Sequence, residues 1–327
     1  MRTKAKHTLS PAEQLYVNLP ADASTTEVAL ATVALWDEED ARKKGYSEKV
    51  ADAQAAAERK KAKKDAAAKR KAAKQSKTAR LPFALYASSY AMPRNMLTSA
   101  LFPVGKGPRT HYADDIRILA AAGGVFKYRG PEIRQDDGGV LMALIAETCG
   151  RMLARAVIFN PLEMCKKLGR ETTDGRYAVQ HLRHCIQRLK SAVISVEYPQ
   201  GFLEVSLIAK FAGDLHDEKW AVALDPEIVL LFQGTPTFID IKKRALLKEG
   251  LQTALLGYFS AMYEDNTFSI EDLHKHSGSK ASLRVFGRKL RSALPRLVAA
   301  RVIAGFTATR GSVTIVRNQK PAVMMGA

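Results

Sequence analysis

One order of elements occurs twice in this chain, and it restricts the possible folds more than any other feature of the sequence. In each copy, a short helix with a polar N-cap leads through a tight turn into a longer amphipathic helix, and two β-prone segments follow. The first copy covers roughly residues 160–210 and the second roughly 269–317. Helix, turn, helix and hairpin in this order are typical of a winged helix. The sequence therefore predicts an α+β protein with two tandem winged-helix domains.

The first copy begins at Asn160, which is predicted to cap a short helix that has Pro161 at its first position and ends before Gly169. A longer helix is predicted over about 175–192, with strands at 193–197 and 203–210 after it. Its apolar stripe is predicted to consist of Tyr177, Leu182, Cys185, Ile186 and Leu189. The opposite, polar face carries Arg176, Gln180, Arg183, Gln187 and Lys190.

The second copy begins at Ser269, which is predicted to cap a short helix over 270–276. After a turn at 277–279, a long helix is predicted over about 280–300, and strands follow at 302–307 and 313–317. The predicted apolar stripe is Leu283, Phe286, Leu290, Leu294 and Leu297. The polar residues at the start and on the outer face of this helix are Lys280, Ser282, Arg284, Arg288 and Arg291.

Charge and residue type suggest what these polar faces bind. The chain carries a net charge of +18, which favours a polyanionic partner. Arg and Gln match the donors and acceptors of base edges in the major groove, whereas Lys mainly meets phosphates. A solvated surface is the simpler explanation of one charged helix, but both helices here are poor in acids and follow a short helix and a turn. We therefore expect both to bind double-stranded DNA, with Arg310 and Ser312 of the second hairpin touching the adjacent backbone.

The rest of the chain suggests four segments. Residues 1–40 are expected to be a disordered, mixed segment, and residues 41–80 a basic Ala/Lys-rich arm, helical or disordered, with fifteen Lys or Arg against four acids. The arm could be a solubilising linker or a non-specific DNA-binding arm, and both alternatives stay open. Residues 81–215 and 216–327 are expected to form the two winged-helix domains. Strands are predicted at 116–119, 125–129 and 220–224, a turn at 136–139, and helices at 140–149, 228–232 and 251–263.

No catalytic or cofactor site is expected. The chain has no Gly-x-x-x-x-Gly-Lys-Ser/Thr loop for a nucleotide, and His181, His184, His274 and His276 are not spaced as a metal cluster. Asp136 and Asp137 could suggest a metal-dependent nuclease, but they stand in the predicted turn without a third carboxylate nearby. The three cysteines match neither a zinc site nor a disulfide framework, and no apolar run is long enough to cross a membrane. These features predict a cytoplasmic, non-enzymatic protein without a metal.

Several segments resemble the TrfA-type plasmid replication initiators, which are related to the wider RepA/RepE group. They include Tyr-Arg-Gly-Pro-Glu-Ile-Arg-Gln-Asp-Asp at 128–137 and Leu-Glu-Val-Ser-Leu at 203–207. Further matches lie at 92–93, 99–102, 175–177, 225–232 and 278–289, so the resemblance covers about 82–317. It implies binding to direct repeats (iterons) at a plasmid origin, local duplex opening and recruitment of the host helicase DnaB, often with DnaA. It also implies a homodimer in equilibrium with an active monomer.

The same family carries a sliding-clamp motif of the Gln-Leu-x-Leu-Phe kind before the first winged helix. The corresponding segment here, 78–83, lacks the glutamine. A better match starts at Gln14, so Gln14, Leu15, Val17 and Leu19 are the predicted clamp-binding residues. Two other functions are alternatives to an initiator: a winged-helix transcription regulator stays open, and a nicking enzyme is disfavoured because a metal cluster is missing from the sequence.

Overall fold

The structure is a computed structural model that describes residue 42 and residues 79–85, 89–122, 125–170, 175–198, 201–213, 218–232 and 236–318. Contacts divide the chain into two units, Met1–Ala73 and Lys74–Ala327, and the elements below belong to the second. This unit is a mixed α+β fold. The predicted clamp segment at 14–19 and nearly all of the predicted arm lie outside the described residues.

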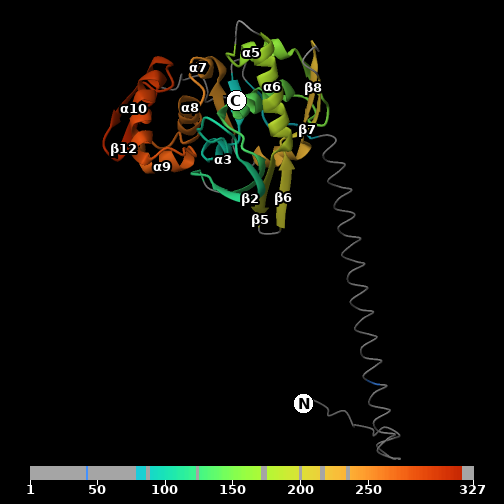
Figure 1. The fold of residues 1–327 in the computed structure, drawn as a ribbon, viewed down its shortest axis with the longest axis horizontal. Helices are drawn as coiled ribbons and strands as arrows, with labels where there is room; N and C mark the ends of the chain where they lie inside the picture. Colours follow the sequence, from blue (N-terminus) through green and yellow to red (C-terminus); the bar gives the residue numbers. More distant parts are fainter. Residues whose placement is uncertain are drawn as a thin grey trace, which may run out of the picture. The chain divides into compact units, whose positions relative to one another are not determined.

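The helical pair of the first copy forms as predicted (Figure 1). Helix α5 (Pro161–Lys167) begins after Asn160, whose side chain accepts hydrogen bonds from the backbone N–H groups of Leu162 (2.9 Å) and Glu163 (3.1 Å). The predicted cap is therefore confirmed. Helix α6 (Gly175–Ser191) buries Ala178, Val179, Leu182, Cys185, Ile186 and Leu189.

The prediction for Tyr177 was wrong, because this side chain is 66% exposed. Ala178 and Val179 occupy the inward positions of the first turn of α6 instead. At about 100° per residue, Tyr177 lies roughly 140° from the middle of the buried stripe, at the edge of the polar face. The helical period therefore places Tyr177 outside the stripe, and only its apolar ring favoured the prediction.

A four-stranded sheet follows α6, with the order β2-β3-β5-β6. Its strands are β2 (His111–Leu119), β3 (Val125–Pro131), β5 (Val193–Tyr198) and β6 (Gly201–Ser206). The strand predicted at 203–210 is divided, because β7 (Ile208–Ala212) leaves this sheet to pair with β8 (Trp220–Leu224). Strand β8 also pairs with β4 (Val157–Phe159), giving a second sheet ordered β4-β8-β7.

Helix α4 (Gln135–Thr148) packs against α6, and its first turn corrects a prediction. Residues 136–139 do not form a free turn but begin this helix. Glycine suits both positions because a larger residue would crowd a close neighbour. A Cβ on Gly138 would lie 3.2 Å from the Phe102 ring, and one on Gly139 would lie 2.6 Å from the Arg244 guanidinium. The glycines therefore serve close packing rather than chain reversal.

The second copy also has the predicted order: α9 (Ile270–His276), α10 (Leu283–Ala299), β11 (Gly305–Ala308) and β12 (Ser312–Val316). The Ser269 hydroxyl accepts hydrogen bonds from the N–H groups of Glu271 (3.2 Å) and Asp272 (3.3 Å), so this cap is confirmed too. Strand β10 (Thr267–Ser269) completes a sheet ordered β10-β12-β11. Leu283 was wrongly placed in the apolar stripe: it is the first helical residue and is 45% exposed.

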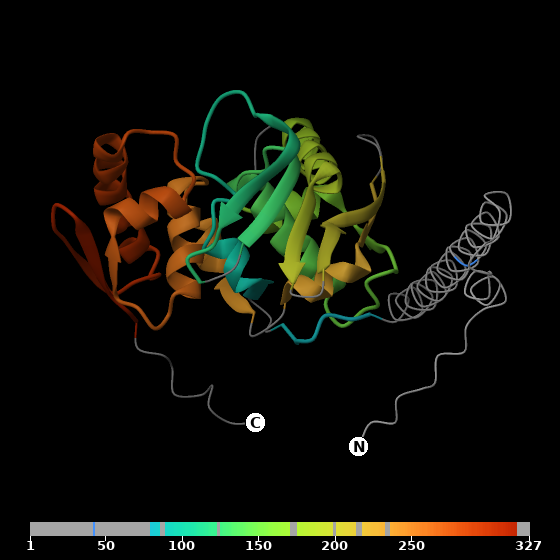
Figure 2. The ribbon, with the colours of Figure 1, turned by 90° about the horizontal axis from the view of Figure 1, so that it is seen from below.

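The remaining elements join the two copies. Helix α8 (Leu251–Ala261) packs against α10 and against α3 (Arg94–Leu97), while β1 (Ser89–Met92) pairs with β9 (Thr237–Asp240). The 3-10 helix η1 (Pro226–Phe232) and helix α7 (Ile241–Ala245) complete the described elements. Figure 2 shows α8, α9, α10 and the β11–β12 hairpin, orange to red, gathered on one side of the four-stranded sheet.

One hydrophobic core runs through both copies. Strand β8 comes after the predicted domain boundary at 215/216 but pairs with β4, which comes before it. The boundary itself stays a prediction. Across the described helices, none combines the length and the apolar character that a membrane crossing requires.

Candidate nucleic-acid interface

A row of polar side chains lies on the outer face of α6. Arg176, Gln180, Gln187 and Lys190 are exposed, and Arg183 is half-buried. The sequence of α6 contains no Asp or Glu, so nothing on this helix offsets the positive charge of the row. The row can therefore offer both cationic groups and amide donors and acceptors to a polyanion.

Helix α10 has a comparable outer face. Arg284 and Arg288 are exposed, and α10 also contains no Asp or Glu. Ser282 is the exposed residue just before the helix, and its side chain makes no capping hydrogen bond. A hydroxyl at the N-terminal end of a helix can meet a phosphate.

Arg291 and Ser312 have structural partners in the free protein. The Arg291 guanidinium donates to the Thr309 carbonyl at 2.9 Å, which ties the outer face of α10 to the β11–β12 turn. The Ser312 hydroxyl lies 2.9 Å from that of Thr309, and the Ser312 N–H donates to the same Thr309 oxygen at 3.0 Å. Both residues thereby hold the turn in place, while Arg310 is exposed within it.

Lys280 has a buried carboxylate as its partner. Its ammonium lies 3.1 Å from a carboxylate oxygen of Glu132, which is only 2% exposed and also pairs with the Arg134 guanidinium at 2.6 Å. Burial acts to raise the pKa of Glu132, but hydrogen bonds from Arg134 and Lys280 outweigh it and hold the pKa at about 2, below the ordinary 4.5. Lys280 therefore fastens the turn before α10 to the end of β3.

A cluster of buried charges anchors the inner flank of α6 to the start of α4. Asp137 is fully buried and accepts hydrogen bonds from Arg109 (2.8 Å) and from the Arg188 Nε (2.9 Å). Asp136 accepts from Arg109 at 2.5 Å and lies 3.2 Å from the His181 Nε2. Burial acts to raise the pKa of Asp136, but the hydrogen bonds from His181 and Arg109 outweigh it, so this pKa is well below its ordinary value.

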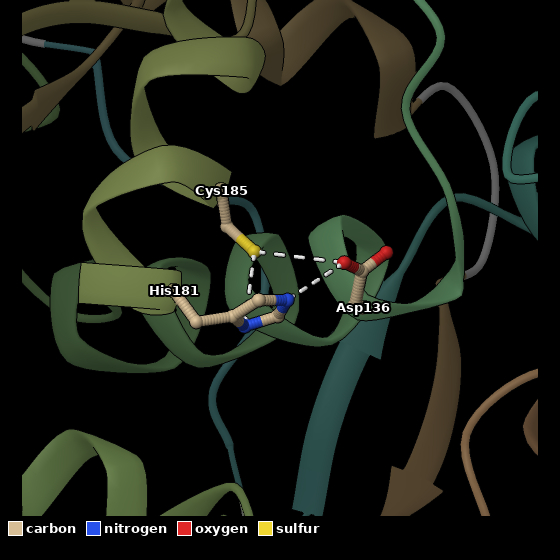
Figure 3. A group of neighbouring side chains, drawn as sticks. All are labelled: Asp136, His181 and Cys185. Atoms are coloured by element: carbon tan, nitrogen blue, oxygen red, sulfur yellow. Dashed lines mark hydrogen bonds and ion pairs between the residues drawn. The ribbon is translucent and has the colours of Figure 1, made fainter. Parts of the chain in front are cut away.

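Three side chains of this region could suggest a metal site. Asp136, His181 and Cys185 each offer one ligand atom, and these atoms lie within 4.8 Å of one another (Figure 3). Guanidinium groups, however, already occupy them: besides Arg109 on Asp136, Arg170 lies 3.4 Å from the His181 Nδ1 and Arg188 3.2 Å from the Cys185 sulfur. Burial raises the pKa of the Cys185 thiol well above its ordinary value. A divalent cation would meet three positive charges and a protonated thiol, so the arrangement fits an ion-pair cluster better than a metal.

Spacing along the chain did not reveal the residues that position α6. Arg109, Asp136 and Arg188 are far apart in sequence, and Asp136 was assigned to a turn. A signal in the sequence was the pair of adjacent acids directly after Gln135 in a basic chain. The structure groups the predicted residues into one row on α6 and a second set on α10 and its hairpin, the latter linked through Arg291 and Thr309.

Comparisons with known proteins give one family match and several distant structural likenesses. A family model described as "TrfA protein" matches residues 42–294. No curated protein matches the sequence. Among solved structures, domains 2 and 3 of RctB give a TM-score of 0.48 at 15% identity, covering 70% of this chain and 99% of that one. A second structure of these RctB domains gives 0.45 at 14% identity, with coverages of 67% and 95%.

A third solved structure is the Pi initiator protein in complex with iteron DNA. It gives a TM-score of 0.40 at 11% identity and covers 57% of this chain and 96% of that one. All three scores lie below 0.5, so these likenesses alone assign neither a fold nor a function to the chain.

Proposed function

Since the chain belongs to the TrfA family and is a plasmid replication initiator, we infer that it recognises repeated sites, or iterons, in the duplex DNA of a plasmid origin. The observation that carries this proposal is the pair of acid-free helices, α6 and α10, each with exposed arginines on its outer face. Each follows a short helix whose N-terminus is capped by a polar side chain, and each precedes a hairpin. We interpret the two copies as winged helices whose second helices enter major grooves.

The proposed roles follow from side-chain chemistry. Arg176, Gln180, Arg284 and Arg288 have the donors and acceptors to pair with base edges, and Lys190 has the point charge for a phosphate. Arg183, Gln187 and Arg291 extend the two rows. Arg310 and Ser312 belong to the hairpin that would lie over the neighbouring DNA backbone. Ser282 and Lys280 belong to the segment that leads into α10.

The binding test compares residues on and off the proposed surface. We expect Arg284→Ala to weaken binding to a repeat from the protein's own origin by about 1–3 kcal/mol and to relax base preference at one position. Arg296→Ala is the matched control, since Arg296 is exposed near the other end of α10 and off the line of Arg284 and Arg288. Equal losses for both variants would mean that charge alone, and not the outer face of α10, drives binding.

Replication requires steps beyond DNA binding, and for these we propose partners. The sequence has no nucleotide-binding loop of the Gly-x-x-x-x-Gly-Lys-Ser/Thr kind, so we propose a non-enzymatic initiator that opens the duplex locally and recruits the host helicase DnaB, together with DnaA. The setting is the cytoplasm, where the plasmid lies. Purified DnaB should be retained by the full-length protein bound to origin DNA. Failure of retention would remove the recruitment step and leave DNA binding untouched.

The family resemblance supports two further partners. A homodimer in equilibrium with the monomer is expected, and sedimentation over a range of concentrations tests it. Gln14, Leu15, Val17 and Leu19 are proposed to bind the sliding clamp, so Gln14→Ala and Leu19→Ala should lower retention on immobilised clamp. Unchanged retention would eliminate this site. If the protein binds its sites but an origin plasmid replicates without it, the alternative of a transcription regulator is favoured.

A further inference from the structure

The start of α6 exposes apolar surface that the core does not use. Tyr177, in the first turn of α6, is 66% exposed. Leaving a tyrosine ring this exposed gains nothing for folding. The ring is therefore available for contact with a ligand.

Tyr177 borders the cationic row of α6. It follows Arg176 in the chain and precedes Gln180 by three residues, so in a helix its ring stands beside the Gln180 side chain. All of these residues lie in the first two turns, the part of a recognition helix whose side chains contact base edges. An apolar group at this position meets the same DNA surface that the neighbouring Arg and Gln would read.

The chemistry of the major groove narrows what an apolar side chain can recognise there. Each base pair presents donors and acceptors, and the C5-methyl group of thymine is the one apolar feature. We propose that Tyr177 packs against the methyl group of a thymine in each DNA repeat, beside the base edge read by Gln180. This inference rests on the proposed DNA-binding function and names a base that α6 selects.

The test changes the DNA rather than the protein, by removing the methyl group of thymine. A duplex selected from a random library by the full-length chain is the probe, and each thymine in it is replaced singly by uracil, which lacks only the C5-methyl. At one position we expect uracil to weaken binding about fourfold, the loss that corresponds to one buried methyl group. The other replacements should change affinity by less than about twofold.

Variants then assign the effect to Tyr177. Tyr177→Phe keeps the ring and should keep the preference for thymine over uracil. Tyr177→Ala should bind the thymine duplex more weakly than the wild type does, and should bind the thymine and uracil duplexes with equal affinity. Tyr263→Ala is the matched control, since Tyr263 is also exposed and lies outside α6. Thermal melting checks that each variant is folded.

The possible results distinguish failure of this inference from failure of the proposed DNA-binding function. A chain that binds the selected duplex but shows no uracil effect at any thymine overturns the role of Tyr177 and leaves the DNA-binding function standing. A uracil effect that persists in Tyr177→Ala also overturns it, because another side chain then contacts the methyl group. If no duplex is enriched over random DNA, sequence-specific binding itself fails.

Discussion

Replacing Glu132 by glutamine tests whether the contact between β3 and the turn before α10 stabilises the fold. The variant keeps the size of the side chain but removes the charge shared by Arg134 and Lys280. The carboxylate is 2% exposed, and its pKa is held at about 2 instead of 4.5. At about 1.4 kcal/mol per pKa unit, that difference corresponds to roughly 3 kcal/mol of folding free energy.

The local geometry supports a loss of this size and not a larger one. The Arg134 guanidinium retains two backbone partners after the change, the carbonyls of Gly107 (3.0 Å) and Pro108 (2.8 Å). A buried cation without any partner would cost more, about 3–5 kcal/mol. We therefore expect Glu132→Gln to lower the free energy of unfolding by about 3 kcal/mol near neutral pH, measured by urea denaturation.

The pH dependence gives a second check of the same reasoning. A carboxylate with a lowered pKa stabilises the fold above its ordinary pKa of 4.5, and this stabilisation is lost as the pH falls through about 2. The difference between the wild type and Glu132→Gln should thus fall below about half of its neutral value near pH 3. Glu264→Gln, at an exposed position, is the control and should change stability little. A difference under about 1 kcal/mol, or one that does not vary with pH, would refute the reasoning.

Three further predictions address other parts of the molecule. Arg188→Ala removes hydrogen bonds to the buried Asp137 and should cost about 2–3 kcal/mol of stability in urea unfolding. Lys190→Ala, on the exposed face, should cost under about 0.5 kcal/mol. Similar losses for the two variants would argue against the anchoring role of Arg188. Gly130→Ala should cost about 2–4 kcal/mol, because φ is +123° and a Cβ would lie 2.6 Å from the Ser191 carbonyl oxygen. Gly311→Ala, which has open space, should melt like the wild type. Deleting residues 41–80 should make the salt dependence of DNA binding shallower by about 0.9 for each phosphate that the arm neutralises, with sequence preference retained; loss of preference with an unchanged slope would contradict this division.

Local chemistry was enough to predict the order of elements in both copies. Asn160 and Ser269 are polar caps directly before an apolar-periodic segment, and each makes its two hydrogen bonds within three residues along the chain. The spacing of Leu290, Leu294 and Leu297 reports a buried face in the same local way. Such features depend on neighbours one or two turns away, so the sequence alone contains them.

Contacts between distant segments decided what local patterns could not. Gly138 and Gly139 resemble a turn in sequence, and only the folded structure shows that they belong to a helix and leave room for Phe102 and Arg244. The grouping of Arg109, Asp137 and Arg188 likewise depends on tertiary packing.

The polar and apolar faces of α6 and α10 were thus set by the sequence itself, through side-chain spacing along a helix. The anchoring of those helices was decided by the tertiary structure, because buried charges are stable only where distant partners meet them. Lys280 illustrates the division: its charge and its place before α10 are evident in the sequence, but its pairing with Glu132 exists only because the folded chain brings β3 to that turn.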